Sequence, residues 1–224
     1  MITAKNLSLQ YPDGTIALNE INLHIKAGEL VYITGPSGSG KTSLIKLLMG
    51  IEKPTAGQLE VLSHSMNRID VKNRMFLRQY MGPVFQELKL INGRTVLDNV
   101  ILGMRFLPIP KQQWKTLATD ALEKVKLSHK ILSYAENLSW GEKQRVAIAR
   151  AIVRRPSLII ADEPTGNLDR KNAINILELL NSLRQENTSV IITTHATHLI
   201  DSKLVDQFIQ IAAGQLEAKS MEEF

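Results

Sequence analysis

The sequence predicts an α/β fold built on a mostly parallel sheet. Three apolar runs are typical of buried strands: LVYITG at 30–35, SLIIADEP at 157–164 and SVIITTH at 189–195. Helical patterns follow the first two runs, namely TSLIKLLMG and RKNAINILELLNSLRQ. Buried strands that alternate with helices favour a parallel sheet covered by helices.

The opening stretch differs from this pattern. Residues 2–29 alternate apolar and polar side chains around turn signals at Pro12-Asp13-Gly14 and Ala27-Gly28. Alternation between turns is typical of antiparallel strands that face a core on one side. We therefore expect an N-terminal antiparallel β-subdomain beside the parallel sheet.

The middle of the chain, at about 88–155, contains no convincing strand. It holds an amphipathic stretch from Trp114 to Leu127 and a second helical pattern from Gly141 to Val153. These patterns predict an α-helical subdomain inserted in the α/β core. The whole chain, 1–224, is expected to form one domain, because this length supports a single substantial α/β core.

Composition excludes several classes of protein. Apolar residues make up 44% of the chain, which indicates a packed core, and there is no cysteine for disulfides or thiolate metal sites. The opening MITAKNLSLQ lacks the pattern of a secretion signal, and no apolar run approaches the roughly 20 residues that span a bilayer. The net charge of +5 leaves a nucleic-acid or anionic-lipid surface open. Because aromatic residues do not alternate with the basic ones, we expect no nucleic-acid partner.

The segment GPSGSGKT fits the phosphate-binding loop pattern and lies between a strand and a helix. Glycines let successive N–H groups point at phosphate, and the following helix adds its positive N-terminal end. Lys41 is expected to bind the β- and γ-phosphates of a nucleotide, and Thr42 is expected to bind Mg²⁺. The predicted nucleotide-binding residues here are Gly35, Pro36, Ser37, Gly38, Ser39, Gly40, Lys41, Thr42 and Ser43.

The strand LIIADE ends in two acids, which places both carboxylates at the carboxyl edge of the sheet. Asp162 is expected to hold Mg²⁺ through water, and Glu163 to act as a general base on the attacking water. With the phosphate-binding loop upstream, these acids predict a nucleoside triphosphatase of the P-loop type.

The segment LSWGEKQR at 138–145 resembles the signature of ABC ATPases, usually LSGGQ or LSGGE followed by QR. The resemblance implies the ABC ATPase fold, ATP hydrolysis, and a homodimer in which each signature faces the partner's nucleotide. Ser139, Gly141 and Glu142 would then contact the γ-phosphate side, although Ser139 and Glu142 also form a helix capping pattern. Trp140 departs from the family, since glycine is usual there. A residue with a bulky ring cannot take the open backbone conformations that glycine allows. We expect its ring either to stack near the nucleotide or to weaken closure of the dimer.

Other residues take family roles by the same resemblance. It implies adenine stacking for Tyr11, a Mg²⁺ and water contact for Gln86, a loop that reads the partner subunit at Asn167-Leu168-Asp169, and a switch histidine at His195. Tyr11 also fits an ordinary strand aromatic, and a lone histidine is often structural. The implied catalytic residues are therefore Glu163, His195 and Gln86, with Thr42, Gln86 and Asp162 at the metal.

Within the family, IADEPTGNLD at 160–169 resembles the group of the cell-division ATPase FtsE, the lipoprotein-release ATPase LolD and the macrolide-efflux ATPase MacB. The stretch at 76–100 is most similar to the FtsE type, with departures at Glu87 and Ala196. That type implies an FtsX-like integral membrane protein as partner, a peripheral place on the cytoplasmic face of the plasma membrane, and control of septal cell-wall hydrolysis.

Alternatives stay open at this point. A LolD- or MacB-like transporter subunit would carry the same motifs. A soluble ABC protein acting on ribosomes or DNA usually needs two fused ATPase domains or long coiled coils, for which 224 residues leave no room. A non-hydrolysing binding module is disfavoured by Glu163 and His195. The apolar Leu88, Leu90 and Ile91, in the groove expected around Phe85 to Asn99, fit either a partner's docking surface or plain core.

Overall fold

The three apolar runs form neighbouring strands in the computed structural model, which describes residues 1–217. Their sheet has the order β10-β9-β3-β8-β7-β6. All neighbours pair in parallel except β10 with β9, so the predicted mostly parallel sheet is confirmed. Its strands are β3 (Leu30–Thr34), β6 (Met81–Val84), β7 (Leu158–Asp162), β8 (Ser189–Thr194), β9 (Gln207–Ala212) and β10 (Gln215–Glu217).

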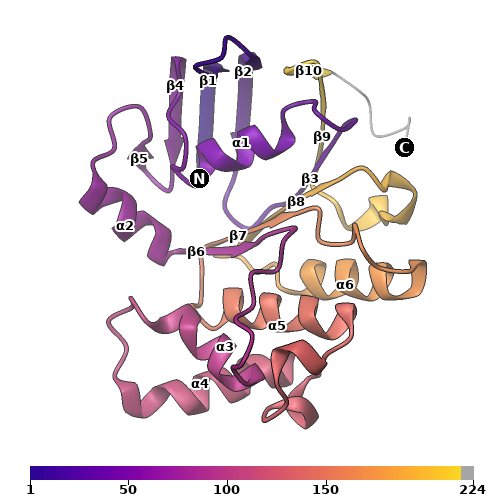
Figure 1. The fold of residues 1–224 in the computed structure, drawn as a ribbon. Coiled ribbons are helices and arrows are strands. Elements are labelled where there is room, and N and C mark those ends of the chain that lie inside the picture. The colour runs from indigo at the N-terminus through magenta and orange to yellow at the C-terminus, as the bar shows by residue number, and fades with distance from the viewer. Residues whose placement is uncertain (218–224) are drawn as a thin grey trace.

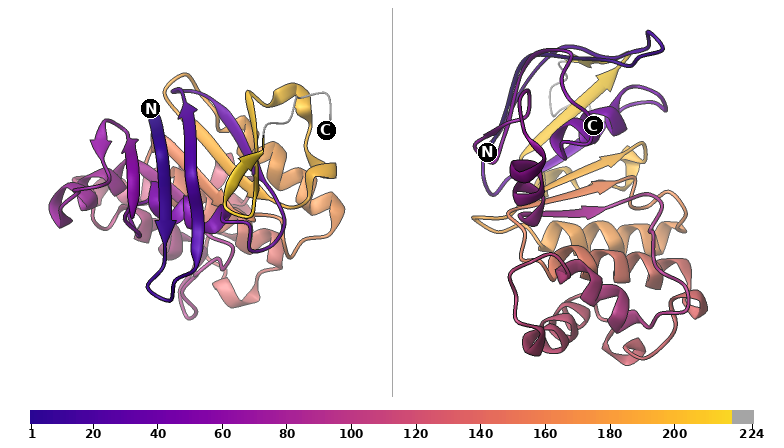
Figure 2. Two further views of the ribbon diagram at one scale, coloured as in Figure 1. Left: turned by 90° about the horizontal axis from the view of Figure 1, so that it is seen from above. Right: turned by 60° about the vertical axis from the view of Figure 1, so that its left-hand side comes forward.

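The N-terminal segment forms a separate antiparallel sheet, as predicted. Its order is β2-β1-β4-β5, with β1 (Ile2–Gln10), β2 (Ile16–Ile25), β4 (Ala56–Val61) and β5 (His64–Ser65). This sheet lies above α1 (Lys41–Leu48), which separates it from the mostly parallel sheet in Figures 1 and 2. Because α1 is enclosed from both sides, the residues that precede it are fixed in position by two sheets.

The alternation of side chains along β3 divides the core in two. Val31 and Ile33 pack with α1 and the antiparallel sheet, whereas Leu30 and Tyr32 pack with the helices on the opposite face. Successive residues of a strand point to opposite faces, so a strand buried on both sides reads as a continuous apolar run. Burial raises the pKa of the Tyr32 hydroxyl to about 12, although that hydroxyl donates a 2.9 Å bond to the Asn181 side chain.

Helices cover the lower face of the parallel sheet in Figure 1. They are α3 (Val96–Ile101), α4 (Lys111–Lys124), α5 (Trp140–Ile152) and α6 (Arg170–Ser182), while α2 (Val71–Gln79) lies beside β6. Short 3-10 turns cover Leu102–Met104, Ser128–Lys130, Ala135–Asn137, Thr197–Leu199 and Ser202–Leu204.

Between β6 and β7 the described chain forms helices and a single isolated bridge, from Thr95 to Tyr134. One buried cluster runs from the sheet through α5 to α3 and α4, so the helical part shares its core with the sheet. The subdomain limits of about 88–155 stay a prediction, and 218–224 of the predicted domain lie outside the described residues. No helix within 1–217 has the length and apolar character that a bilayer crossing requires.

Helix limits shift from the sequence pattern for local reasons. The amphipathic stretch expected at Trp114–Leu127 forms a helix that begins earlier, directly after Pro110, and ends at Lys124. Lys126 takes a φ of 57°, and a left-handed residue just past a helix ends it. Leu127 is buried beyond that end, which is why its apolar character extends the pattern.

The packing of α1 yields a stability prediction. Leu44 is fully buried between the two sheets, so Leu44→Ala removes apolar contacts on both sides and leaves a cavity. We expect it to lower the free energy of unfolding by about 2–5 kcal/mol in urea titration. The matched control Ile16→Ala, on a side chain that is 62% exposed, should stay within about 0.5 kcal/mol. Equal effects of the two substitutions would contradict the packing of α1 between the two sheets.

Candidate functional site

The loop between β3 and α1 is shaped by glycines that no other residue can replace without distortion. Gly35 has a φ of 145°, and a Cβ there would lie 2.1 Å from the Ile211 carbonyl oxygen. The loop therefore passes directly against β9. The hydroxyl oxygen of Ser39 is buried in this loop and has no hydrogen-bond partner among residues 1–217. Since buried polar atoms are normally satisfied, an oxygen-rich ligand such as phosphate fits this position.

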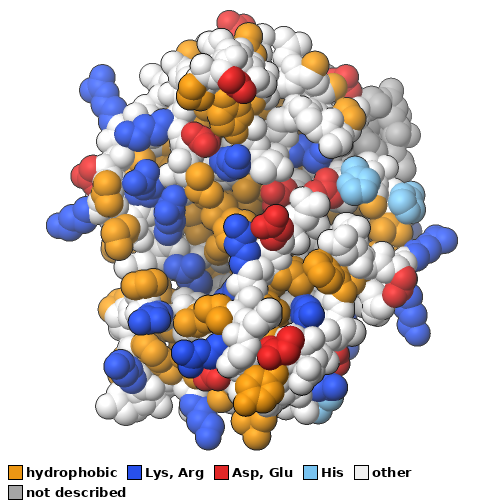
Figure 3. Space-filling model, viewed as in Figure 1, with side chains coloured by type: hydrophobic (Ala, Val, Ile, Leu, Met, Phe, Trp, Pro, Cys, Tyr) orange, Lys and Arg blue, Asp and Glu red, His pale blue; other side chains and the backbone are white. Residues whose placement is uncertain are grey.

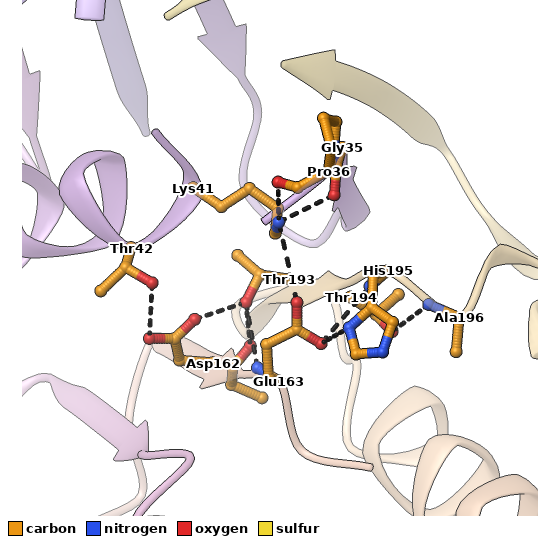
Figure 4. Close-up of polar contacts among 11 residues, drawn as sticks. Gly35, Pro36, Lys41, Thr42, Asp162, Glu163, Thr193, Thr194, His195 and Ala196 are labelled. Atoms are coloured by element: carbon orange, nitrogen blue, oxygen red, sulfur yellow. Dashed lines mark hydrogen bonds and ion pairs between the residues drawn. The ribbon is translucent and has the colours of Figure 1, made fainter. Parts of the chain in front are cut away.

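Lys41 begins α1 and turns its ammonium back toward this loop. Its Nζ donates to the carbonyl oxygens of Gly35 at 2.8 Å and Pro36 at 3.0 Å, as Figure 4 shows. It also lies 3.8 Å from the Glu163 carboxylate, and its side chain is only 7% exposed. A buried cation is thus held at the N-terminal end of a helix, which is the electrostatic requirement for binding phosphate.

Asp162 ends β7 and is fixed by two hydroxyl groups. Thr193 donates to its Oδ1 at 2.7 Å, and Thr42 donates to its Oδ2 at 3.3 Å. Thr193 lies opposite Asp162 in the parallel register of β7 and β8 and is fully buried. The phosphate loop and the acidic strand end therefore meet through Thr42 and Asp162, as the sequence predicted.

Glu163 has an unusual backbone conformation. Its φ of 46° lies in the left-handed region, which costs a non-glycine residue on the order of 1 kcal/mol or more. Its N–H bonds to Thr193, at 3.1 Å to the carbonyl oxygen and 3.0 Å to the hydroxyl, and so holds this conformation. Such strain clusters at functional sites.

The Glu163 side chain lies between two nitrogen groups in Figure 4. Its Oε2 is 2.9 Å from His195 Nδ1 and accepts the His195 N–H at 3.3 Å, while its Oε1 faces Lys41. The carboxylate is 11% exposed, whereas His195 is 65% exposed. The structure therefore brings together Lys41, Thr42, Asp162, Glu163 and His195 at the carboxyl edge of the sheet.

Sequence reasoning missed Thr193, although its hydroxyl contacts both acids. The signal was present, because two threonines interrupt the apolar run of β8 immediately before His195. Polar residues in a fully buried strand need a hydrogen-bond partner, and neighbouring strand ends supply one.

The donor set fits a magnesium ion. A hydroxyl and a carboxylate oxygen meet at Thr42 and Asp162, and Mg²⁺ prefers oxygen ligands. Among residues 1–217 no cluster of three or more His, Cys, Asp or Glu side chains could hold a metal. Mg²⁺ suits this sparse set, because it commonly binds one or two protein oxygens together with substrate phosphates and water.

Two predicted residues flank this centre. The Tyr11 hydroxyl lies 3.1 Å from the Ser43 hydroxyl on α1, and Lys46 Nζ lies over the Tyr11 ring at 5.7 Å from its centroid. Gln86 is exposed just after β6, and its Nε2 would lie 3.9 Å from a Cβ on Gly166. Gln86 is thus beside the segment that follows Glu163, while its predicted contact with metal stays a prediction.

The signature segment forms the start of α5. Ser139 caps the helix by accepting the Glu142 N–H, and Glu142 accepts the Ser139 N–H at 2.8 Å. These bonds, with Lys130 nearby, lower the pKa of the Glu142 carboxyl. A Cβ on Gly141 would meet Leu168 and Asn172 at 3.7–3.8 Å, so this segment packs beside the loop at 167–169. No described contact joins the signature to the phosphate loop of the same chain.

Trp140 and Asp169 both lie at the start of a helix, and the role predicted for Asp169 at the partner subunit stays a prediction. Trp140 is the first residue of α5 and is absent from the positive-φ residues, so the backbone needs no glycine there. Its ring is 42% exposed. Asp169 caps α6 through bonds from Asn172, which lower the pKa of its carboxyl.

The apolar segment after Gln86 divides between core and surface. Leu88 is buried in the helical core cluster and Leu90 packs against it. Ile91 is 47% exposed and lines a cavity of about 570 Å³ with α3 and Trp114. Leu88 therefore belongs to the core, whereas Ile91 is exposed enough to contact a partner.

Comparison with known proteins agrees with this geometry. The family model described as ABC transporter matches residues 18–166. The chain is 38% identical over 217 residues to the cell division ATP-binding protein FtsE of Mycobacterium tuberculosis, covering 96% of this chain and 94% of that protein. It is 38% identical over 202 residues to FtsE of Bacillus subtilis, covering 90% and 89%. A dimeric structure of the ATP-binding cassette MJ0796 in a post-hydrolysis state, bound to ADP and Pi, aligns with a TM-score of 0.86 at 32% identity over 98% of each chain.

The position of Lys41 leads to a binding prediction. Lys41→Ala removes the buried cation of the loop, and hydrogen bonds to charged groups contribute about 1.5–3 kcal/mol. We therefore expect ATP affinity to fall by roughly 10- to 100-fold in calorimetric titration. The control Lys124→Ala, exposed at the end of α4, should bind as the unmodified chain does. Unchanged affinity of Lys41→Ala would overturn the phosphate-loop assignment.

Proposed function

Since the chain belongs to the ABC transporter family and is an ATP-hydrolysing subunit of it, we propose that two copies close over two Mg-ATP molecules. We propose further that this closure drives an FtsX-like integral membrane protein in cell division. The observation that carries the proposal is the cluster at the carboxyl edge of the sheet. There three segments of the chain meet: Lys41 and His195 each lie within 4 Å of the Glu163 carboxylate, and Thr42, next to Lys41, donates to Asp162 at 3.3 Å.

Each residue of the cluster has a step to perform. Lys41 binds the β- and γ-phosphates, for which its ammonium leaves the carbonyl oxygens of Gly35 and Pro36. Glu163 accepts a proton from the attacking water, as a general base whose carboxylate is oriented by its strained backbone. His195 orients that carboxylate through the 2.9 Å contact and lies on the exposed side, where the γ-phosphate is reached.

Mg²⁺ belongs to the same proposal. Thr42 and Asp162 would hold it, with Gln86 reaching it from the loop after β6. When bound, the ion neutralises charge that develops on the transferred phosphoryl group. The hydroxyl of Thr193 binds Oδ1 of Asp162, which leaves Oδ2 on the side of Thr42.

The partner copy completes the site in this proposal. Ser139, Gly141 and Glu142, at the N-terminal end of α5, would face the γ-phosphate bound by the other chain, where a helix N-terminus favours an anion. Asp169 lies in the neighbouring loop, which would contact the partner subunit. The dimeric structure of the MJ0796 cassette supports this arrangement, because that cassette aligns with nearly the whole of this chain.

The FtsE relatives support the wider role. They are named as cell division ATP-binding proteins and align over about nine tenths or more of this chain. An FtsX-like partner would hold the chain at the cytoplasmic face of the plasma membrane and pass the closing motion to cell-wall hydrolases at the septum. Membrane contact is then made through the partner, and no nucleic acid is involved.

The general-base role predicts a trapped intermediate. Glu163→Gln keeps the shape of the side chain but cannot accept a proton, so hydrolysis should fall by at least about 100-fold. ATP should then hold the variant as a dimer, measured by light scattering with multi-angle detection. Glu178→Gln on α6 is the matched control and should turn over ATP normally.

Two results would contradict parts of the proposal. A Glu163→Gln variant that stays monomeric in ATP would exclude the head-to-tail dimer. A trapped variant that recovers a lipoprotein-release or efflux permease from membranes, in place of an FtsX-like protein, would exclude the cell-division role while leaving the ATPase intact.

Trp140 provides an internal probe of closure. The chain has two tryptophans, and Trp114 is partly buried, with its Nε1 donating to the Ile109 carbonyl. In a Trp114→Phe, Glu163→Gln background, ATP should bury the Trp140 ring against the partner and shift its fluorescence to the blue. ADP serves as the control ligand. An unchanged spectrum in a sample that forms dimers would place Trp140 outside the interface.

A further inference from the structure

The helix α2 turns most of its apolar side chains toward solvent. Leu77 is its one buried residue, and Val71, Met75 and Phe76 are exposed. Because a helix repeats about every 3.6 residues, these three lie on the half that faces away from Leu77. Tyr80 follows the helix and is exposed too, with its ring 5.2 Å from that of Phe76. A surface helix normally points its apolar side to the core, so this reversed arrangement indicates a binding surface.

The inward side of α2 is held by polar contacts instead. Arg74 and Arg78 donate to the Gly50 carbonyl oxygen at 3.5 and 3.2 Å, and Arg78 also donates to the Met49 oxygen at 3.1 Å. These carbonyl groups lie at the C-terminal end of α1, where the helix dipole favours cations. The attachment of α2 to the fold therefore relies on its arginines and Leu77, and its outward apolar side chains are available for another contact.

A further exposed aromatic side chain lies beside the end of α2. The Gln79 side chain donates to the Phe106 carbonyl oxygen at 3.4 Å, so the loop at 105–110 adjoins this helix. Phe106 is 77% exposed, although Leu107 and Ile109 of the same loop pack against the helical core. Two prolines restrict the backbone of the loop. The loop is thus anchored to the fold, and it presents the Phe106 ring outward.

Basic side chains accompany these apolar ones. Lys72 lies on the outward half of α2, and Arg105 and Lys111 lie on either side of Phe106 along the chain. All three are exposed, and none forms an ion pair within residues 1–217. No acidic residue lies in α2 or in 99–111. In Figure 3, basic and apolar side chains gather on the left flank, where Figure 1 places α2. We call the outward side of α2, together with Arg105, Phe106 and Lys111, the α2–Phe106 surface.

We propose that the α2–Phe106 surface contacts an anionic lipid bilayer directly, with its apolar side chains among the headgroups and its cations on lipid phosphates. Phenylalanine and tyrosine beside lysine and arginine are typical of segments that lie on a membrane surface. Cations near an anionic bilayer are attracted to its negative surface potential. This contact goes beyond the proposed function, in which the membrane is reached through the partner. It is weak alone, and the partner supplies the second attachment that stable membrane binding needs.

Shape and charge favour lipid over a second protein surface. Figures 1 and 2 place α2 along an outer flank of the molecule, and Phe106 is the most exposed large apolar side chain among residues 1–217. Aromatic side chains that anchor protein partners are usually buried in well-packed pockets. A projecting helix and loop that carry only positive charge meet a broad anionic surface without needing such a pocket.

The experiment uses the full chain without its partner and measures its flotation with vesicles. One set contains phosphatidylglycerol and phosphatidylcholine in equal amounts, and the other contains phosphatidylcholine alone. We expect binding to be at least about 10-fold stronger with phosphatidylglycerol, because three cations meet the anionic surface. Added salt should weaken this binding, since it screens exposed charges.

Variants of the chain locate the contact. Lys72→Gln and Arg105→Gln should each weaken binding to phosphatidylglycerol vesicles by about fivefold, and Phe106→Ala by at least about fivefold. Lys203→Gln and Ile16→Ala change exposed residues of other segments and are the matched controls, so they should bind as the unmodified chain does. ATP turnover and urea titration verify that each variant folds.

A fluorescent reporter tests whether the loop itself enters the lipid. In a Trp114→Phe, Trp140→Phe background, Phe106→Trp provides a single tryptophan on the surface. Its emission should shift to the blue on phosphatidylglycerol vesicles and be quenched by brominated lipid. Ile16→Trp in the same background is the control and should show neither change.

The outcomes separate this proposal from the proposed function. Absent or equal binding to the two sets of vesicles, or unchanged binding in the three surface variants, would overturn the lipid contact. Variants that keep vesicle binding but lose the complex with the membrane partner in detergent would show a protein-docking surface and overturn it as well. None of these results affects ATP hydrolysis or the ATP-bound dimer. Failure of the unmodified chain to form that complex would instead overturn the proposed partner.

Discussion

One buried hydroxyl, that of Thr193, joins the two acids on which the site depends. It donates to Asp162 and accepts from the Glu163 backbone, because β7 and β8 pair in parallel with Asp162 opposite Thr193. A shift of the β7–β8 register by one residue would turn Thr193 to the other face of the sheet and release both acids. The apolar residues that fix this register, Ile160 and Ile191 among them, therefore set the position of the chemistry as firmly as the polar residues do.

Much of the site could be predicted because its motifs coincide with regular elements. The loop at 35–42 and the acids at 162–163 follow continuous apolar runs, which only a strand buried on both faces produces. The helix α2 was not predicted, since Leu77 is its only buried residue and its other apolar side chains are exposed. The strands β9 and β10 were not predicted either, because β9 is only partly buried and lacks the continuous apolar run of β3, β7 and β8. The pairing of Arg78 with Arg154 depends on β6 lying against the end of α5, which no local pattern reveals.

Trp140 replaces the glycine that the family usually carries in the signature segment. The structure accommodates Trp140 in an ordinary helical backbone, and the capping bonds of Ser139 and Glu142 do not involve its ring. The usual glycine at this position is therefore not a requirement of the isolated fold. The exposed Trp140 ring changes the surface at the start of α5, which is the end proposed to face the partner's nucleotide.

The surface groove beside β6 and the catalytic edge of the sheet share one short segment of chain. Pro83 and Phe85 line the groove, and Gln86, the next residue, lies beside Gly166 in the segment that follows Glu163. A ligand that packs on Phe85 therefore acts within one residue of a side chain next to the catalytic loop. Such proximity produces coupling only if the segment has two arrangements that both sites favour unequally. Gln86 is exposed, whereas Val84 and Leu88 on either side are buried, so the chain is anchored on both sides of Gln86. If the segment has two such arrangements, the short loop after β6 is where a ligand on Phe85 and a bound nucleotide would influence one another.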